Sequence, residues 1–291
     1  MKRFGVIGHP IAHSLSPLLH GKAYEFLHLN CSYESFDILP EALYDTVQSL
    51  HKQGFAGLNV TLPHKEAVAR FVHMTTDEAK TVGAVNTILF DGDLTTGDNS
   101  DVYGFAASIE SVRGLFEGRT VLVLGAGGSA RAVLYALISR FRPSEIIVAN
   151  RNENRGSELL RHFADRAGDV RLTASSLEPA KLHALVDSAA LIVNCTSLGL
   201  SPAVKGCPVP DDTVFRSEQV VVDLIYTPLQ TRLLAIAKAS GARTISGLEM
   251  FLHQGARSFE LWLGQSMPVG HLRPVIVNEL ERQQREVRQH L

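Results

Sequence analysis

Residues 119–139, RTVLVLGAGGSARAVLYALIS, hold the pattern that decides the fold of this chain. An apolar run that ends at Leu124 predicts a buried strand, and the residues after the glycines predict a helix. Gly125 permits a tight turn, Gly127 lets the backbone approach a pyrophosphate, and Ala130 lets the helix pack closely on the sheet. We therefore predict a dinucleotide-binding turn with the phosphates at the helix N-terminus. The residues of this turn are Gly125, Ala126, Gly127, Gly128, Ser129 and Ala130. A structural turn without a ligand is the alternative.

The strand expected after this turn ends in basic rather than acidic residues. Residues 145–155 read EIIVANRNENR. In many NAD-binding units an Asp or Glu at this place binds the ribose hydroxyls. Here Asn150, Arg151 and Arg155 stand instead, and guanidinium groups bind a 2′-phosphate through paired charged hydrogen bonds. We predict NADP as the cofactor; ordinary surface charge is the alternative, above all for Arg155.

Strands and helices alternate along most of the chain, which predicts an α/β protein. Further strands of the nucleotide-binding unit are expected at 190–199 and 220–226. In the first hundred residues, the alternation of strands and helices predicts a largely parallel sheet, with a hairpin at Asp91-Gly92. Ser16 is expected as a helix N-cap, and Gly54 as a helix stop. The last two helices, expected at 248–264 and from Pro274 on, should return to the first unit.

The predicted fold is thus a discontinuous α/β substrate domain plus a doubly wound Rossmann-type NADP domain. We place the substrate-binding and catalytic domain at residues 1–102 and 247–291, and the NADP domain at residues 103–246.

The composition excludes several classes of partner. The net charge of −2 gives no electrostatic reason to expect nucleic acid or an anionic membrane as a partner. The 3 cysteines lack CxxC spacing, which fits a reducing cytoplasm and neither a disulfide framework nor a zinc site. The histidines form no HExxH-like pair, so we expect no metal.

Lys65 and Asp101 are the candidates for proton transfer. Lys65 follows a predicted strand in NVTLPHKEAV, and Asp101 lies in GDNSDVYGF. Ligands of open α/β sheets bind near strand ends, and a dehydrogenase that acts on an alcohol needs a group that moves the hydroxyl proton. A surface lysine and a helix-capping aspartate are the alternatives.

Taken together, the motifs resemble those of the shikimate dehydrogenase family. They are, in order along the chain, GHPIAHSLSPLLH, GLNVTLPHKEAV, GAVNT, GDNSDVYGF, GAGGSARAV, NRNENR, NCTSLG, VVDLIYTPLQTRLL and GLEMFLHQGARSFELWLG. The resemblance covers residues 8–264 and implies NADPH-dependent, reversible reduction of 3-dehydroshikimate to shikimate, in aromatic amino acid biosynthesis.

The resemblance also implies roles for individual residues. Lys65 and Asp101 correspond to the catalytic pair. The substrate-binding residues implied are Ser14 and Ser16 for the carboxylate, Thr61, Asn86 and Gln254 for the ring hydroxyls, and Tyr226. The cofactor-binding residues implied are Asn150, Arg151, Arg155, Thr196, Ser197, Leu198, Gly247 and Met250, besides the glycine turn.

Some positions depart from the family pattern. Leu15 stands where a lysine is usual, and Ser100 and Asn152 stand where threonines are usual. Loss of the lysine removes a positive charge near an anionic ligand. A quinate or aminoshikimate dehydrogenase of relaxed specificity is therefore an alternative, and a non-catalytic metabolite or NADP sensor is another. The oligomeric state, monomer or homodimer, is left open.

Overall fold

The computed structural model describes residues 1–289, and side chains up to residue 285. Two compact units divide the chain. The first comprises Met1–Gly104 and Leu252–Glu279, and the second comprises Phe105–Phe251 and the last helix from Leu280 on. The division falls inside three helices, α5 (Ser100–Ile109), α10 (Gly247–Leu263) and α11 (Val269–Gln289).

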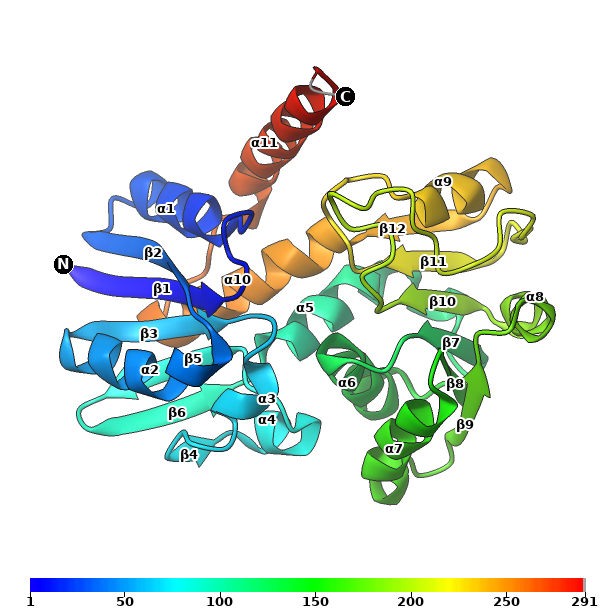
Figure 1. The fold of residues 1–291 in the computed structure, drawn as a ribbon, viewed down its shortest axis with the longest axis horizontal. Helices are drawn as coiled ribbons and strands as arrows, with labels where there is room; N and C mark the ends of the chain where they lie inside the picture. Colours follow the sequence, from blue (N-terminus) through cyan, green and yellow to red (C-terminus); the bar gives the residue numbers. More distant parts are fainter. Residues whose placement is uncertain (290–291) are drawn as a thin grey trace. The chain divides into compact units, whose positions relative to one another are not determined.

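The first unit holds a mixed six-stranded sheet in the order β2-β1-β3-β5-β6-β4 (Figure 1). Its strands are β1 (Lys2–Gly8), β2 (Cys31–Asp37), β3 (Phe55–Val60), β4 (Met74–Thr75), β5 (Thr87–Asp91) and β6 (Leu94–Asp98). β1 pairs in parallel with β2 and β3, whereas β5 is antiparallel to both β3 and β6. The predicted hairpin at Asp91-Gly92 is confirmed, but the sheet is less parallel than expected.

Helices cover both faces of this sheet. They are α1 (Ser16–Phe26), α2 (Leu43–Lys52), preceded by a 3₁₀ turn at Pro40–Ala42, α3 (Lys65–Val68), α4 (Asp77–Val82) and α5 (Ser100–Ile109). Val47 of α2, Val68 of α3 and Ala79 of α4 share one buried cluster with Leu58 of β3. Gly54, at φ 82°, follows the C-cap of α2 as predicted. Ser16 is not the N-cap of α1: Leu15 holds that position, and Ser16 is the first helical residue.

The first unit's part of α10 packs against this sheet and against α1. Trp262 donates from Nε1 to the carbonyl of Ile88 in β5, and its ring stacks on Phe4 of β1 at 4.8 Å between centroids. A Cβ at Gly57 would lie 2.3 Å from Nε1 of Trp262, so this approach requires glycine. A Cβ at Gly255 would likewise lie 2.6 Å from Leu19 of α1. The expected return of the chain to the first unit is confirmed for this helix.

The second unit holds an all-parallel six-stranded sheet in the order β12-β11-β10-β7-β8-β9. The strands are β7 (Thr120–Leu124), β8 (Glu145–Asn150), β9 (Arg171–Ser176), β10 (Leu191–Asn194), β11 (Val220–Asp223) and β12 (Arg243–Ser246). The unit's first and fourth strands, β7 and β10, are neighbours, which is the strand order of a doubly wound Rossmann sheet. The predicted fold class is confirmed.

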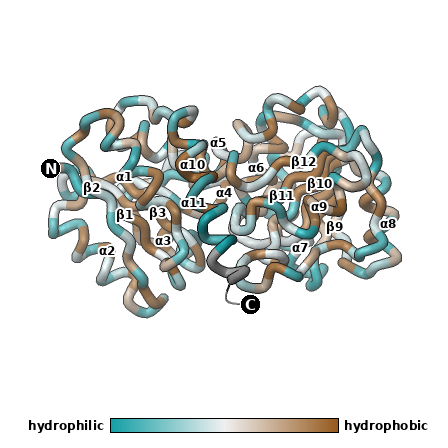
Figure 2. Tube along the Cα trace, turned by 90° about the horizontal axis from the view of Figure 1, so that it is seen from above, coloured by the Kyte–Doolittle hydropathy of each residue, from teal (hydrophilic) through white to brown (hydrophobic). Residues whose placement is uncertain are grey.

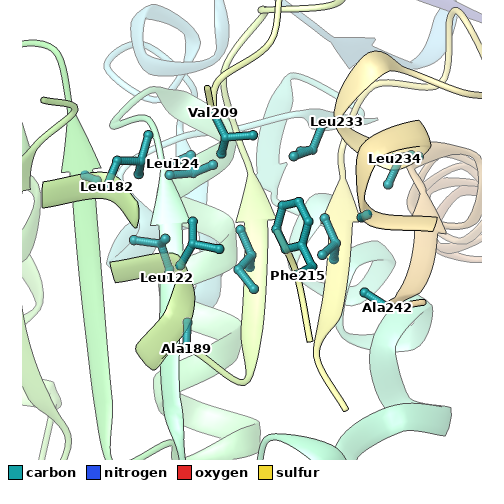
Figure 3. Close-up of a cluster of buried hydrophobic side chains, with 14 of the residues drawn as sticks. Leu122, Leu124, Leu182, Ala189, Val209, Phe215, Leu233, Leu234 and Ala242 are labelled. Carbon is teal, nitrogen blue, oxygen red and sulfur yellow. The ribbon is translucent and has the colours of Figure 1, made fainter. Parts of the chain in front are cut away.

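Helices cover both faces of the second sheet as well. They are α6 (Gly128–Ala136), α7 (Glu153–Phe163), α8 (Pro179–Ser188) and α9 (Arg232–Ala239), with short helical turns at Glu110–Leu115, Leu137–Phe141 and Ala164–Arg166. Leu182 of α8, Leu233 of α9 and Phe215 pack on Leu122 of β7 in the cluster of Figure 3. α6 and α7 lie on the other face (Figure 1). Every residue of β10 and β11 is buried, and both strands are brown in the hydropathy view of Figure 2.

Several elements were not predicted, among them three strands, helices α4 and α5, and the start of the last helix. β4, β9 and β12 are edge strands with exposed or half-buried, largely polar residues, so they lack the apolar runs that mark the central strands. The last helix, α11 (Val269–Gln289), begins before Pro274 rather than at it. Pro274 is the sixth residue of this helix, where a proline has no N–H for the backbone hydrogen bond to the preceding turn.

Substitution of Gly57 by alanine tests the contact between α10 and the sheet. We expect Gly57→Ala to lower the free energy of unfolding by about 1–3 kcal/mol, because the new methyl group would overlap the indole of Trp262. Urea denaturation measures this change. Gly21→Ala, at an uncrowded helical glycine of α1, is the control and should be neutral or stabilising by up to about 1 kcal/mol. An equally stable Gly57→Ala would contradict the packing described.

Candidate active site

Lys65 and Asp101 form a close, buried ion pair in the first unit. Lys65 is the first residue of α3, and Asp101 is the second residue of α5. Nζ of Lys65 lies 2.5 Å from Oδ2 of Asp101, and the two side chains are only 13% and 7% exposed. Neither is therefore a solvated surface charge. Burying two charges is costly unless they pair and form further hydrogen bonds, so this pair needs support from its surroundings.

Asn86 supplies that support. It lies just before β5 and is almost fully buried. Its Nδ2 donates to Oδ1 of Asp101 at 2.9 Å and to the hydroxyl of Ser100 at 3.0 Å. Its Oδ1 accepts the backbone N–H of Ser100 at 2.7 Å. Both oxygens of the Asp101 carboxylate are thus held, one by an ammonium group and one by an amide.

The buried polar groups continue beyond Asn86. Ser258 of α10 and Thr87 of β5 meet at 2.8 Å between hydroxyls, and Ser258 accepts from Nδ2 of Asn59 at 2.8 Å. Oδ1 of Asn59 accepts the hydroxyl of Tyr33 at 2.7 Å. Burial raises the pKa of that phenol well above its usual range, so it remains a donor. His20 stacks on Tyr33 at 4.4 Å, and burial lowers its pKa to about 3, which keeps the ring neutral.

The two serines proposed for a carboxylate lie together at the start of α1. The hydroxyl of Ser14 accepts the backbone N–H of Ser16 at 3.3 Å, while Ser16 itself is buried. Leu15 between them is only 4% exposed and belongs to the core. A leucine at this place is therefore explained by packing. The position shows no sign of a missing charged group.

Thr61 and Gln254 complete the predicted substrate set of the first unit. Thr61 follows β3 directly, and its backbone N–H donates to Ile7 of β1 at 2.9 Å. Gln254 is half-buried in α10, and its carbonyl accepts the hydroxyl of Ser258 at 3.2 Å. Four of the predicted residues lie next to a strand of one sheet: Thr61, Asn86, Lys65 and Asp101. Gln254 instead comes from a helix far along the chain.

In the second unit, the glycine turn has the geometry expected of a phosphate-binding turn. Gly125 has φ 99°, and a Cβ there would lie 2.9 Å from Thr196. A Cβ at Gly127 or Gly128 would meet nothing within 4 Å, so the backbone borders open space at the N-terminus of α6. No side chain caps this helix, and Ala130 is fully buried. The first amides of α6 are free to bind an anion.

The end of β8 places the predicted basic residues at the surface. Arg151 and Arg155 are exposed, and neither guanidinium has an ion pair or hydrogen bond to another described residue. Nδ2 of Asn150 donates to the carbonyl of Asn152 at 2.9 Å. Asn152 is the N-cap of α7 and accepts the backbone N–H of Arg155. Asparagine caps helices at least as well as threonine, so this departure from the family pattern preserves the turn.

The segment after β10 is held by a buried carboxylate. Oδ1 of Asn194 accepts the N–H and the hydroxyl of Thr196 at 2.9 and 2.7 Å, and Thr196 in turn accepts the N–H of Leu198. Nδ2 of Asn194 donates to Asp223 at 2.9 Å, and Thr231 donates to the same carboxylate. These bonds fix the turn that contains Ser197. Burial, opposed by these hydrogen bonds, raises the pKa of Asp223 from 3.8 to about 6.

Tyr226, Gly247 and Met250 also belong to the second unit. Tyr226 stacks on Phe251 at 4.7 Å, and burial raises the pKa of its phenol to about 12, so it is neutral. A Cβ at Gly247 would lie 2.1 Å from the carbonyl oxygen of Leu224, so only glycine fits at the start of α10. Met250 is buried in the following turn.

Sequence reasoning did not single out Tyr33, Ser258, Asp223 or Asn194, and it noted Asn59 only as a polar residue near a strand end. A buried polar residue in an apolar strand, such as Asn194 in LIVN, is the one local signal that could have drawn attention. Among the described side chains, which end at residue 285, no group of three from His, Cys, Asp or Glu could hold a metal. In the same part of the chain, no helix is long and apolar enough to cross a membrane.

A Rossmann-type sheet with an open glycine turn, and an α/β unit with a buried lysine–aspartate pair, define a two-unit dinucleotide-binding protein. Three family models match the chain. The model of the shikimate dehydrogenase substrate binding domain matches residues 6–88, and that of shikimate / quinate 5-dehydrogenase matches residues 108–202. The model of the shikimate 5′-dehydrogenase C-terminal domain matches residues 247–276. The chain belongs to the shikimate dehydrogenase family.

Individual relatives agree with this assignment. The shikimate dehydrogenase (NADP(+)) of Salinibacter ruber is 42% identical over 265 residues, which are 90% of this chain and 92% of that protein. The Thermus thermophilus shikimate 5-dehydrogenase, solved with NADP(H) and shikimate, is 37% identical, with a TM-score of 0.83 over 97% of this chain and 99% of that one. The quinate dehydrogenase of Corynebacterium glutamicum, solved with NAD, is 28% identical, with a TM-score of 0.85 over 95% and 99% of the two chains.

The raised pKa of Asp223 predicts a pH-dependent stability. The folded state favours the protonated form, so ionisation destabilises the fold above pH 6, and this penalty disappears below pH 4. The shift of the Asp223 pKa from 3.8 to about 6 corresponds to a loss of roughly 3 kcal/mol in the free energy of unfolding once the carboxyl group is ionised. We expect Asp223→Asn to gain up to that amount of stability relative to the parent between pH 4 and pH 7, as measured by urea denaturation at each pH. A stability difference that is independent of pH would show that Asp223 is not responsible.

Proposed function

We propose that this chain catalyses the NADPH-dependent, reversible reduction of 3-dehydroshikimate to shikimate. The observation that carries the proposal is the buried Lys65–Asp101 pair in a chain of this family. NADPH, when bound, supplies the hydride. Lys65 gives its proton to the carbonyl oxygen as that oxygen becomes a hydroxyl, and in the reverse direction it takes the proton back. Asp101 holds the ammonium group in place and balances its charge.

The substrate side of the proposal uses residues of the first unit. Ser14 and Ser16 bind the carboxylate through hydroxyl donors, and Thr61 and Gln254 bind ring hydroxyls, which need partners that both donate and accept. Asn86 is proposed to contact a ring hydroxyl too. Its amide is already bonded to Asp101 and Ser100, so its main contribution is to orient the carboxylate. Tyr226 of the second unit is proposed to contact the substrate as a neutral donor.

The cofactor side uses residues of the second unit. The amides at the start of α6, around Gly127 and Gly128, bind the pyrophosphate, and Arg151 with Arg155 binds the 2′-phosphate. The unpaired guanidinium groups support this assignment, since a site selective for NADP needs free positive charge at the end of the second strand. The remaining proposed contacts, along the cofactor and near its nicotinamide, are Asn150, Thr196, Ser197, Leu198, Gly247 and Met250.

We propose that substrate binding and catalysis belong to a domain of residues 1–102 and 247–291. NADP binding is assigned to a domain of residues 103–246. We propose that the enzyme works in the cytoplasm, which its free cysteines suit, as a monomer or homodimer.

A dehydrogenase that also accepts quinate is the second candidate. The structural similarity to a quinate dehydrogenase favours it. Turnover of shikimate and of quinate with NADP and with NAD, followed by the absorbance of the reduced cofactor, separates the two. A preference for quinate with NAD would overturn the main proposal. Tight binding without turnover would favour a sensor, for which a buried catalytic pair has no purpose.

Removal of the Lys65 amine tests the proton-transfer role. We expect Lys65→Ala to abolish turnover with little loss of shikimate affinity, because the reaction loses its proton donor while the residues that bind the ring remain. Steady-state kinetics and equilibrium binding measure the two effects, and circular dichroism verifies folding. Lys80→Ala, at an exposed lysine of α4, should keep full activity. Turnover within about tenfold of the parent, roughly 1.4 kcal/mol of barrier, would refute the role.

Substitution of Arg151 tests the cofactor preference. We expect Arg151→Ala to raise the KM for NADP about tenfold and to leave the KM for NAD unaltered, since only NADP carries the phosphate that the guanidinium binds. Arg161→Ala, at an exposed arginine near the other end of α7, is the control. Equal losses with both cofactors would show that Arg151 does not recognise the 2′-phosphate.

A further inference from the structure

We propose that Ser258 is a positioning residue for the Lys65–Asp101 pair. The inference rests on the function proposed above and adds to it a residue that touches neither member of the pair. Ser258 lies in α10, one turn after Gln254, and its side chain has no exposed surface. Its hydroxyl links α10 to the buried side-chain hydrogen bonds around Asn86.

The Ser258 hydroxyl lies within hydrogen-bond distance of groups from four segments. Nδ2 of Asn59 in β3 and the hydroxyl of Thr87 in β5 are both 2.8 Å away. The hydroxyl of Ser100, at the start of α5, is 3.1 Å away, and the carbonyl of Gln254 is 3.2 Å away. A hydroxyl has one proton and two lone pairs, so Ser258 is fully used by these neighbours.

The direction of one of these bonds is fixed. Oδ1 of Asn59 accepts the proton of the Tyr33 phenol, which burial keeps un-ionised. Nδ2 of Asn59 also lies 3.2 Å from the backbone carbonyl of Asn86, which can only accept, so Nδ2 is on this side of the amide and donates to Ser258. One lone pair of Ser258 is occupied by this bond, and the other faces the hydroxyls of Thr87 and Ser100. Ser258 thus provides an acceptor for protons that have few other acceptors in this buried place.

The same network reaches Asp101 in two further bonds. The hydroxyl of Ser100 accepts one N–H of Asn86, and the other N–H of Asn86 donates to Asp101. When Ser258 is lost, the Ser100 proton is left with Oδ1 of Asn86, which already accepts the backbone N–H of Ser100 and also lies within reach of the Thr87 hydroxyl. Crowding at Oδ1 displaces the amide and loosens its bond to the carboxylate. The Lys65 ammonium, held by the other carboxylate oxygen, then loses its fixed position.

A purely structural role for Ser258 makes a different prediction. A buried hydroxyl that only ties α10 to the sheet would affect stability and leave the chemical step unchanged. Misplacement of the proton donor instead lowers kcat, because a shift in its position costs rate without weakening the contacts that bind the ring. The split between kcat and KM therefore distinguishes the two roles.

The experiment compares Ser258→Ala and Ser258→Cys with the parent, using shikimate and NADP. Cysteine keeps the shape of serine but hydrogen-bonds weakly, so it guards against a cavity that unfolds the alanine variant. We expect kcat to fall about tenfold in both variants, about 1.4 kcal/mol of barrier, with both KM values within about twofold. Ser108→Ala is the matched control. That serine is also buried in a helix, but it donates to the carbonyl of Phe105 and should keep the parent kcat.

Either of two kinetic results would overturn the inference: a kcat within about twofold of the parent, or a loss of kcat/KM that lies wholly in KM. A crystal structure of Ser258→Ala gives a readout that does not depend on activity. The Asn86–Asp101 contact of 2.9 Å should open, and an unchanged contact would also overturn the inference. A parent without turnover would refute the proposed function, while the crystal structure would still decide the role of Ser258.

Discussion

A buried ion pair between an ammonium group and a carboxylate imposes the main constraint on the first unit. Lys65 and Asp101 gain strong attraction at 2.5 Å but lose most of their hydration. The remaining carboxylate oxygen must then be satisfied by protein, and Asn86 does this. Asn86 in turn needs partners for its own carbonyl and second N–H, which Ser100 provides. The hydrogen bonds that run from Asn86 through Ser100 and Ser258 to Asn59 follow from that requirement.

Much of this architecture could be predicted because its signals are local. The glycine turn, the apolar runs of the central strands and the stop at Gly54 each occupy a few consecutive residues, so the second sheet and many helices could be found from sequence. The edge strands β9 and β12 were missed because one side of an edge strand meets no neighbour and tolerates polar residues. Their identity as strands depends on pairing with β8 and β11.

The network around Asp101 could not be predicted in this way. Asn59, Asn86, Ser100 and Ser258 come from separate segments, and Ser258 is 199 residues from Asn59. No spacing rule connects a serine in a C-terminal helix with an asparagine in an early strand. The roles carried over by resemblance named only residues thought to touch ligands. Residues that orient those groups emerge from the fold alone, because their function lies in contacts between distant parts of the chain.

In both units an asparagine side chain donates a hydrogen bond to a buried aspartate. Asn86 accepts the backbone N–H of Ser100 and donates to Asp101, and Asn194 accepts the backbone N–H of Thr196 and donates to Asp223. In each case the amide is a rigid spacer that fixes a buried carboxylate and the segment after a strand. An aspartate could not donate in this place, and a leucine could do neither.

The difference between the two units lies in the partner of the carboxylate. Asp101 has the Lys65 ammonium beside it, whereas the described contacts of Asp223 come from neutral donors, and burial raises the pKa of Asp223 to about 6. A neutral set of donors suffices for a carboxylate that only shapes a turn. Asp101 has a cation as its partner, as the proposed proton transfer by the Lys65 ammonium group requires. The same Asn–Asp pair is therefore structural in one unit and suited to chemistry in the other.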